Sequence, residues 1–112
     1  MSERHFNWTK ALKFIDPDIE QYTRKLNDFV INRESEIPKK YKELILVACS
    51  AAIRHQAGTR IRGYEAMHHG ASDKEIIEAI SLASFASSSS TLSEGIEALG
   101  DQLTLGPELS SR

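Results

Sequence analysis

The sequence predicts an all-α protein, a bundle of five to six helices with an antiparallel helix hairpin at its centre. Two observations lead to this fold class. Apolar residues recur at three- and four-residue spacing along most of the chain, and no run of alternating apolar and polar residues predicts a strand. In addition, residues that begin and end helices stand between the periodic segments, namely Asp16-Pro17, Pro38, Gly70 and Ser72.

The composition of the 112 residues is that of one globular domain, which we expect to span residues 1–112. Acidic and basic residues are interspersed and the net charge is −2, so the sequence predicts neither a nucleic-acid partner nor a basic membrane patch. No apolar run approaches the roughly 20 residues that span a bilayer. The single cysteine cannot form an intrachain disulfide, which favours a cytoplasmic location.

The N-terminal third is predicted to hold an apolar arm and one helix. We expect the arm, residues 1–15, to pack on the body of the protein or on a neighbouring subunit. Its large apolar side chains are Phe6, Trp8, Leu12, Phe14 and Ile15. Asp16 and Pro17 have the residue types of an N-cap and a first helical position. Apolar residues at helical spacing continue this helix to about Asn32.

The middle of the chain is predicted to form the central hairpin from two helices, 38–54 and 58–69. The first helix is apolar nearly all round over residues 44–53, which is typical of a buried helix. The second helix carries an apolar stripe and ends at Gly70, the residue type preferred just after a helix.

The C-terminal third is predicted to hold two more helices. Ser72 and Glu75 form a capping box before the first of them. Its inner face is expected to contain Ile76, Ile77, Ile80 and Ala83. The four serines of residues 87–90 predict a junction of small residues between the two helices. The last amphipathic helix is predicted from Leu92, Ile96, Leu99 and Leu103. Residues 107–112 are predicted to be a frayed tail.

Glu43 is the first candidate for chemistry, because it is an acid at the start of an otherwise apolar helix. A carboxyl group among apolar residues is typical of general acid/base sites. Alternatively, Glu43 lies on an exposed first turn and forms an ion pair with Lys39 or Lys40. Residues 43, 47, 50 and 54 share one side of a helix, so Arg54 is expected on the same face as Glu43.

His55 is the histidine best placed for proton transfer, a role for which its residue type is suited near neutral pH. Its alternative role is that of a cation at a helix C-terminus. Arg54, Arg60 and Arg62 lie nearby and can hold a carboxylate or phosphate by paired hydrogen bonds, or can form a solvated, salt-bridged surface. We therefore predict Glu43 and His55 as catalytic residues and the three arginines as ligands of a small anionic substrate.

The sequence predicts no metal site and no cofactor. His68 and His69 are adjacent, so on a helix they point about 100° apart and chelate one metal poorly. Cys49 lies among small apolar residues, where a cysteine behaves as a small hydrophobe. The serine run has no glycine elbow and no paired histidine, so it does not indicate a serine hydrolase.

The central segment also resembles a known family. Glu43-Leu44-Ile45, an alanine-rich helix, a polar turn, Gly70-Ala71-Ser72 and Glu75-Ile76-Ile77-Glu78-Ala79 follow one another in the order typical of the carboxymuconolactone decarboxylase family. That family also contains the alkylhydroperoxidase-D-like proteins. The resemblance covers residues 39–85. It implies an alkylhydroperoxidase-D-like fold and a homo-oligomer, either a trimer or a hexamer built from trimers.

The resemblance also implies that the reactive positions are changed. The peroxidase branch of the family carries Cys-x-x-Cys-x-x-x-His, with a glutamate twelve positions before the first cysteine. In this chain Glu43 stands at the glutamate and Arg62 at the histidine. His55 and Gly58 stand at the two cysteines. Thiol peroxidases need a thiolate and a resolving partner, so we do not expect this activity.

The decarboxylase branch, which acts on a carboxylated lactone without a cysteine pair, fits these changes better. The resemblance therefore implies a small-molecule lyase acting on an anionic carboxylate or lactone. Glu43 and His55 would transfer protons, and Arg62, Arg54 or Arg60 would clamp the carboxylate. The alternative is a catalytically silent member of the family that serves as a binding or assembly module.

Overall fold

A computed structural model describes residues 6–106 and Leu109, and this part of the chain contains five α-helices and no strand. The helices are α1 (Trp8–Ile15), α2 (Pro17–Asn27), α3 (Lys39–Ala52), α4 (Gln56–His68) and α5 (Asp73–Leu99). The predicted all-α fold is confirmed. The predicted frayed tail, residues 107–112, lies outside the described residues except for Leu109. Within them, no helix combines the length and the apolar character needed to cross a membrane.

Within the N-terminal arm, Trp8–Ile15 form the helix α1, which packs against α2. The side chain of Asn7 caps α1 by accepting a backbone N–H bond of 3.0 Å from its first turn. Asp16 caps α2 in the same way at 3.2 Å, and Pro17 occupies the first helical position, as predicted. A π-helical turn, Asp28–Asn32, follows α2 and stops where the sequence predicts.

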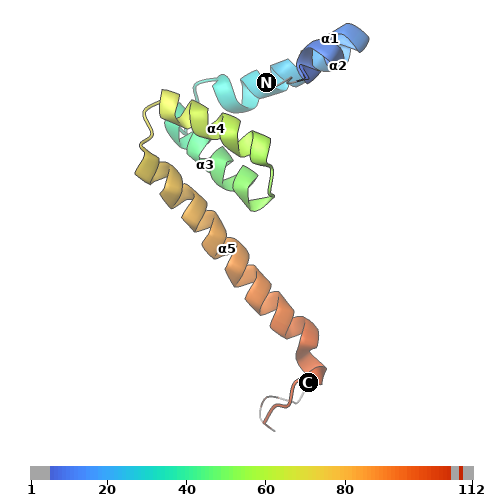
Figure 1. The fold of residues 1–112 in the computed structure, drawn as a ribbon, viewed down its shortest axis with the longest axis vertical. Helices are drawn as coiled ribbons and strands as arrows, with labels where there is room; N and C mark the ends of the chain where they lie inside the picture. The colour runs from blue at the N-terminus through green and yellow to red at the C-terminus, as the bar shows by residue number, and fades with distance from the viewer. Residues whose placement is uncertain (1–5, 107–108, 110–112) are drawn as a thin grey trace, which may run out of the picture.

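α3 and α4 lie side by side as the predicted central hairpin, with α1 and α2 beyond one end of it (Figure 1). Residues 53–55 join the two helices, and so short a connection makes them antiparallel neighbours. Val47 of α3 and Ala66 of α4 are fully buried in a small apolar core that also contains Ala71 and Ile76. This core joins the hairpin to the start of α5.

The turn from α4 to α5 also follows the predicted signals. Gly70 has a φ of +97°, the left-handed conformation that glycine adopts without steric cost just after a helix. Ser72 N–H donates to Glu75 Oε1 at 2.9 Å and Glu75 N–H donates to Ser72 Oγ at 3.1 Å, which completes the capping box. Glu75 also pairs with Lys40 of α3, with 3.0 Å between Nζ and Oε2. The start of α5 is therefore fixed beside the start of α3.

The Lys40–Glu75 ion pair is expected to make stability depend on pH at both extremes. The Ser72 N–H and the Lys40 ammonium lower the pKa of Glu75 below its ordinary 4.5, and Glu75 raises the pKa of Lys40 above 10.5. The lowered carboxyl pKa stabilises the fold above pH 4.5, and this is lost as the pH falls through the lowered value. The raised ammonium pKa stabilises the fold below pH 10.5, and this is lost as the pH rises through the raised value.

Urea unfolding of wild type and Glu75→Gln should accordingly differ at neutral pH and converge as the pH falls through the lowered pKa of Glu75. Lys40→Met should converge with wild type at the alkaline end instead. Glu78→Gln, an exposed acid on the same helix, serves as the control. A difference between Glu75→Gln and wild type that persists unchanged into acid would contradict the role of this pair.

α5 is one continuous helix, so the predicted junction at residues 87–90 is wrong. Hydroxyl groups along α5 bond to carbonyls one turn back, as Thr91 Oγ1 does to the Ser87 oxygen at 2.8 Å. The hydroxyls of Ser81, Thr91 and Ser93 are satisfied in this way without interrupting the helix. With 27 residues α5 is about 40 Å long, nearly twice the length of α3, so its second half projects beyond the hairpin (Figure 1).

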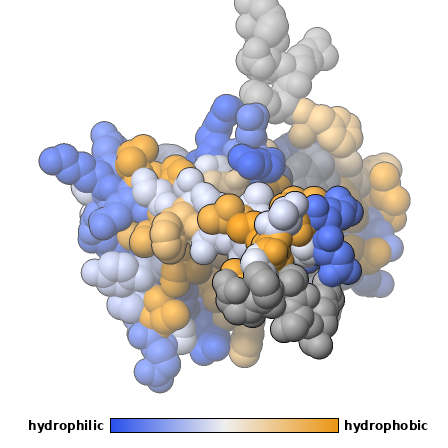
Figure 2. Space-filling view, turned by 90° about the horizontal axis from the view of Figure 1, so that it is seen from below, coloured by the Kyte–Doolittle hydropathy of each residue, from blue (hydrophilic) through white to orange (hydrophobic). Residues whose placement is uncertain are grey.

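The single chain exposes more surface than a compact domain does. Its accessible surface is 9477 Å², against about 6,200 Å² for a compact monomer of 12.5 kDa. Its radius of gyration is 20.5 Å, against about 13 Å for a compact domain of this length. Figure 2 views the end at which α5 finishes and shows apolar side chains, in orange, exposed among hydrophilic ones. Much apolar surface therefore has no cover within the chain.

α3 is also less buried than its composition predicts. Glu43 and Val47 are its buried residues, whereas Tyr41 and Ile45 are each 49% exposed. The prediction of a buried helix is wrong for the single chain, because α4 and α5 cover only the side of α3 that carries Glu43 and Val47. Ile77, predicted on the inner face of α5, is likewise exposed.

Candidate functional site

Glu43 is a fully buried charge at the contact between α3 and α4. Arg62 of α4 donates from Nη1 to Glu43 Oε1 at 3.1 Å and to Oε2 at 3.4 Å. Lys39, one turn before Glu43 on α3, places Nζ 2.9 Å from Oε2. Both cationic side chains are 25% exposed, so they cover the carboxylate while their own charged ends reach water.

These three side chains, termed here the Glu43 cluster, link the two helices of the hairpin. Both carboxylate oxygens have cationic partners, and in the described part of the chain no buried side-chain polar atom lacks a hydrogen bond. A substrate could reach the carboxylate only by displacing Lys39 or Arg62. The geometry is therefore that of an internal ionic link rather than an open acid/base site.

His55 lies at the opposite end of α3 from Glu43. Glu43 lies nine residues, or about 13 Å along the helix, before the end of α3 at Ala52, and His55 follows the turn beyond that end. His55 is the N-cap of α4, and its ring lies over the first turn of that helix, where a Cβ at Gly58 would collide with it. The structure thus brings Arg62 to Glu43 but does not bring His55 there, and Arg60 is exposed on α4. The catalytic roles of Glu43 and His55 remain predictions.

Arg54 adopts a backbone conformation that arginine disfavours. Its φ is +62°, and among the described residues no other non-glycine residue has a positive φ. The Arg54 N–H donates to the Ala51 oxygen at 3.1 Å and the His55 N–H to the Ser50 oxygen at 2.9 Å, a Schellman motif that usually contains glycine. The turn takes Arg54 out of α3, so it does not extend the Glu43 face. Arginine costs about 1 kcal/mol here.

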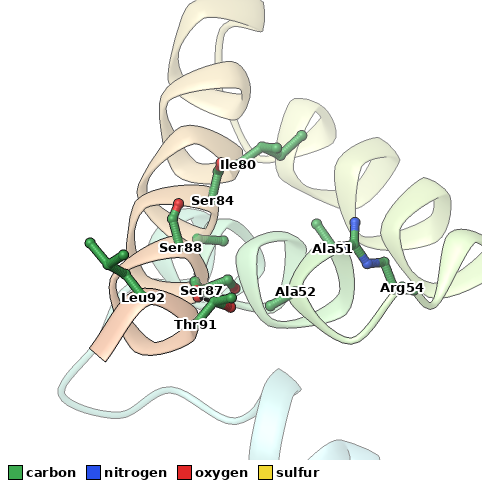
Figure 3. Close-up of a pocket in the computed structure, with 10 residues that line it drawn as sticks. Ala51, Ala52, Arg54, Ile80, Ser84, Ser87, Ser88, Thr91 and Leu92 are labelled. Atoms are coloured by element: carbon green, nitrogen blue, oxygen red, sulfur yellow. Dashed lines mark hydrogen bonds between the residues drawn. The ribbon is translucent and has the colours of Figure 1, made fainter. Parts of the chain in front are cut away.

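Arg54 lines an open groove of about 720 Å³ between the end of α3 and the middle of α5 (Figure 3). Ala51 and Ala52 contribute the α3 side. The α5 side presents hydroxyl groups on one helical face, from Ser84, Ser87 and Ser88, and beside them Thr91, whose hydroxyl donates to the Ser87 carbonyl. One guanidinium and several hydroxyls around small apolar residues can hold a small anion by hydrogen bonds.

Sequence reasoning missed this wall of hydroxyl groups. The signal was present as the offsets of three, four and seven residues from Ser84, which place side chains on one helical face. This pattern can be recognised only when residues 87–90 are assigned to a helix rather than to a junction. The sequence suggested Lys39 only as one alternative ion-pair partner of Glu43. In the structure both Lys39 and Arg62 form ion pairs with Glu43.

The remaining reactive side chains lie apart from the groove lining. Cys49 is exposed on α3, the helix that the sequence predicts to be buried. The His68 and His69 rings meet edge to face with 5.5 Å between their centroids, and His69 Nδ1 lies 2.8 Å from the Glu65 oxygen. In the range of residues that the structure describes, no group of three His, Cys, Asp or Glu is placed to hold a metal ion.

The sequence model of the carboxymuconolactone decarboxylase family matches residues 17–101, about three quarters of the chain. The matched region contains α2 to α5, and with them the Glu43 cluster, Arg54 and the groove. Comparisons with curated proteins and with solved structures found no match. The extent of the family match decides the assignment: the chain belongs to the carboxymuconolactone decarboxylase family.

Proposed function

We propose that this protein binds a small anionic molecule, a carboxylate such as a carboxylated lactone, in the groove beside Arg54. The supporting observation is Arg54 itself, whose backbone is strained while its side chain lines a groove walled by hydroxyl groups. A guanidinium binds a carboxylate through paired N–H donors, and hydroxyls can donate to the same oxygens. Glycine would suit this turn better, so we infer that the arginine is retained for its side chain.

The Glu43 cluster has a supporting role in this proposal. Arg62 is engaged by Glu43 and so is not the clamp for the ligand. The cluster instead fixes α4 against α3, the helix whose end carries Arg54. Arg60 is exposed and is absent from the groove lining, which makes it a suitable control for a general effect of positive charge.

Replacing Arg54 with glycine is expected to raise stability and to abolish ligand binding in the same variant. Glycine relieves about 1 kcal/mol of left-handed backbone strain, while loss of the guanidinium removes the main partner of the anion. Without ligand, the variant should melt at a higher temperature than wild type. In a screen of small carboxylates and lactones, wild type should gain stability by mass action and Arg54→Gly should not.

Arg54→Gly should melt at a higher temperature than wild type and yet show no ligand-induced shift. Unfolding of the variant therefore cannot explain the loss of binding. Arg60→Gln should keep the ligand-induced shift of wild type. The groove proposal fails if no anion shifts wild type, or if Arg54→Gly retains the full shift.

Family membership favours a second candidate, a lyase that decarboxylates a carboxylated lactone by acid/base chemistry. In this candidate Arg54 holds the substrate carboxylate and His55, the next residue in the chain and exposed although not part of the groove lining, transfers the proton. Carbon dioxide release from such a lactone should then disappear in both Arg54→Gly and His55→Gln. Binding without turnover would favour the catalytically silent alternative. Thiol peroxidase activity is not proposed, because the chain has a single cysteine.

We also propose that the protein works as a homo-oligomer, the trimer or hexamer that the family resemblance implies. Its accessible surface exceeds that of a compact monomer by about 3,300 Å², and a stable interface buries roughly 800 Å² per partner. The uncovered apolar side chains of α3 and α5 supply surface for such contacts.

A further inference from the structure

We propose that α5 pairs with α5 of a second copy of this chain, through a coiled-coil seam running from Leu82 to Leu99. This pairing rests on the self-association proposed above and does not depend on the ligand. It identifies the surface by which two copies meet and the element that covers it.

The seam is a stripe of large apolar side chains whose spacing alternates between three and four residues. Its members are Leu82, Phe85, Leu92, Ile96 and Leu99, and Ser89 completes the repeat. A spacing that averages about 3.5 residues is that of a helix packed lengthwise against another helix. The partner of the seam is therefore expected to be a helix with the same repeat.

The seam is exposed along its whole length. The exposed fractions are 64% for Leu82, 73% for Phe85, 66% for Leu92, 53% for Ile96 and 45% for Leu99. The face of α5 that meets the hairpin is the opposite one, because Ile76 is buried and the nine residues from Ile76 to Phe85 turn a helix by about 180°. In the described part of the chain the seam is therefore exposed to solvent, and Leu92 lies at the edge where the seam meets the groove.

The residues beside the seam suit a close contact between two identical helices. They are small and uncharged: Ser81, Ala86, Ser88, Ser93 and Gly95. After Lys74, α5 has no basic residue that could pair with an acid on a second copy. Acidic residues beside the seam would therefore repel each other between two copies, and the seam has none there. Glu94 and Glu97 lie off the seam, toward the outer side of the helix, where pairing does not bring them face to face.

A second copy is the occupant that the lengths of the helices favour. The seam covers 18 residues of a 27-residue helix, whereas the other described α-helices have 8 to 14 residues. No other described helix of the chain is long enough to cover the seam, but α5 of another copy is. The excess surface of about 3,300 Å² is more than such a pairing needs.

Sedimentation velocity of the full chain at micromolar concentration tests the pairing. Wild type should sediment as an oligomer, and the double variant Leu92→Asp/Ile96→Asp should weaken association by roughly 30-fold or more. The matched control is Ser90→Asp/Ala98→Asp, which adds the same charge to the same helix off the seam. This control should associate as wild type does.

Disulfide trapping locates the contact. In a Cys49→Ser background, single cysteines introduced at Leu82, Phe85, Leu92, Ile96 or Leu99 report the seam, and Glu94→Cys reports the outer face. Mild oxidation should give a covalent dimer from seam variants, at every position for parallel helices and at the crossing point for antiparallel ones. Glu94→Cys should give none, because a disulfide needs Cα atoms within about 7 Å.

The outcomes separate this pairing from the broader proposal. A wild-type monomer at micromolar concentration overturns both the self-association and the seam. An oligomer that the Leu92→Asp/Ile96→Asp variant leaves intact, or one that links as readily through Glu94→Cys as through the seam, overturns the seam alone. Ligand binding is measured separately with Arg54→Gly, in which the seam is intact, because Leu92 belongs to the seam and also lines the groove.

Discussion

Replacing Glu43 with alanine is expected to destabilise the protein by about 3 kcal/mol. The substitution leaves Lys39 and Arg62 without their shared carboxylate at a fully buried position. Breaking a buried pair costs about 3–5 kcal/mol, and the lower end applies because both cations are partly exposed and regain some hydration. The free energy of unfolding is measured in urea at one fixed protein concentration, since association also contributes to stability.

Three further variants identify the source of that loss. Glu43→Gln keeps the shape and removes the charge, so it should cost nearly as much as alanine if the ionic link is what matters. Glu43→Leu/Arg62→Leu removes both main partners and should recover much of the loss, because no buried charge is left unpaired. Glu36→Ala, at an exposed acid, should change stability by less than about 0.5 kcal/mol. A cost below about 1 kcal/mol for Glu43→Ala would mean that the cluster does not hold the hairpin together.

Replacing Ala66 with leucine is expected to cost about 2 kcal/mol through overpacking. Ala66 is fully buried on α4 in the core that contains Val47. The added carbon atoms have no space there, so the two helices must separate or side chains must leave their preferred rotamers. Thermal unfolding should shift to lower temperature while far-UV helicity stays unchanged. Ala57→Leu, exposed on the same helix, is the control, and a neutral Ala66→Leu would contradict close packing of the hairpin.

The elements that sequence predicted well are those decided by near neighbours. Asp16 and Pro17 at the start of α2, Gly70 after α4, and Ser72 with Glu75 before α5 each act within a few residues. Their conformations depend on capping bonds and on φ, which the local sequence determines. The helices and the hairpin could therefore be predicted without knowledge of the tertiary structure.

The errors concern properties that depend on what surrounds a helix. The serine run was assigned to a junction on composition, but serine is only moderately unfavourable in a helix and nothing in residues 87–90 breaks one. The exposure of Ile45 and Cys49 could not be predicted because an apolar helix indicates burial without indicating what buries it.

The sequence predicted several residues of the candidate site but not how they are arranged in space. Glu43 and Arg62 are 19 residues apart, and their pairing depends on how α4 lies against α3. The left-handed turn at Arg54 has no residue-type signal, because arginine stands where glycine is usual. The groove depends on α5 continuing through its serines, so the wrong junction also concealed the groove.

The second half of α5 projects from the body, and its last seven residues, 93–99, lie beyond the groove that Thr91 and Leu92 line together with the end of α3. Helices shorter than about 12–15 residues are marginal in water when nothing packs against them. These last turns should therefore become helical as copies meet rather than beforehand, and the rate of the final folding step should rise with protein concentration. Folding and assembly are then one concentration-dependent process, which dilution alone reverses without any denaturant.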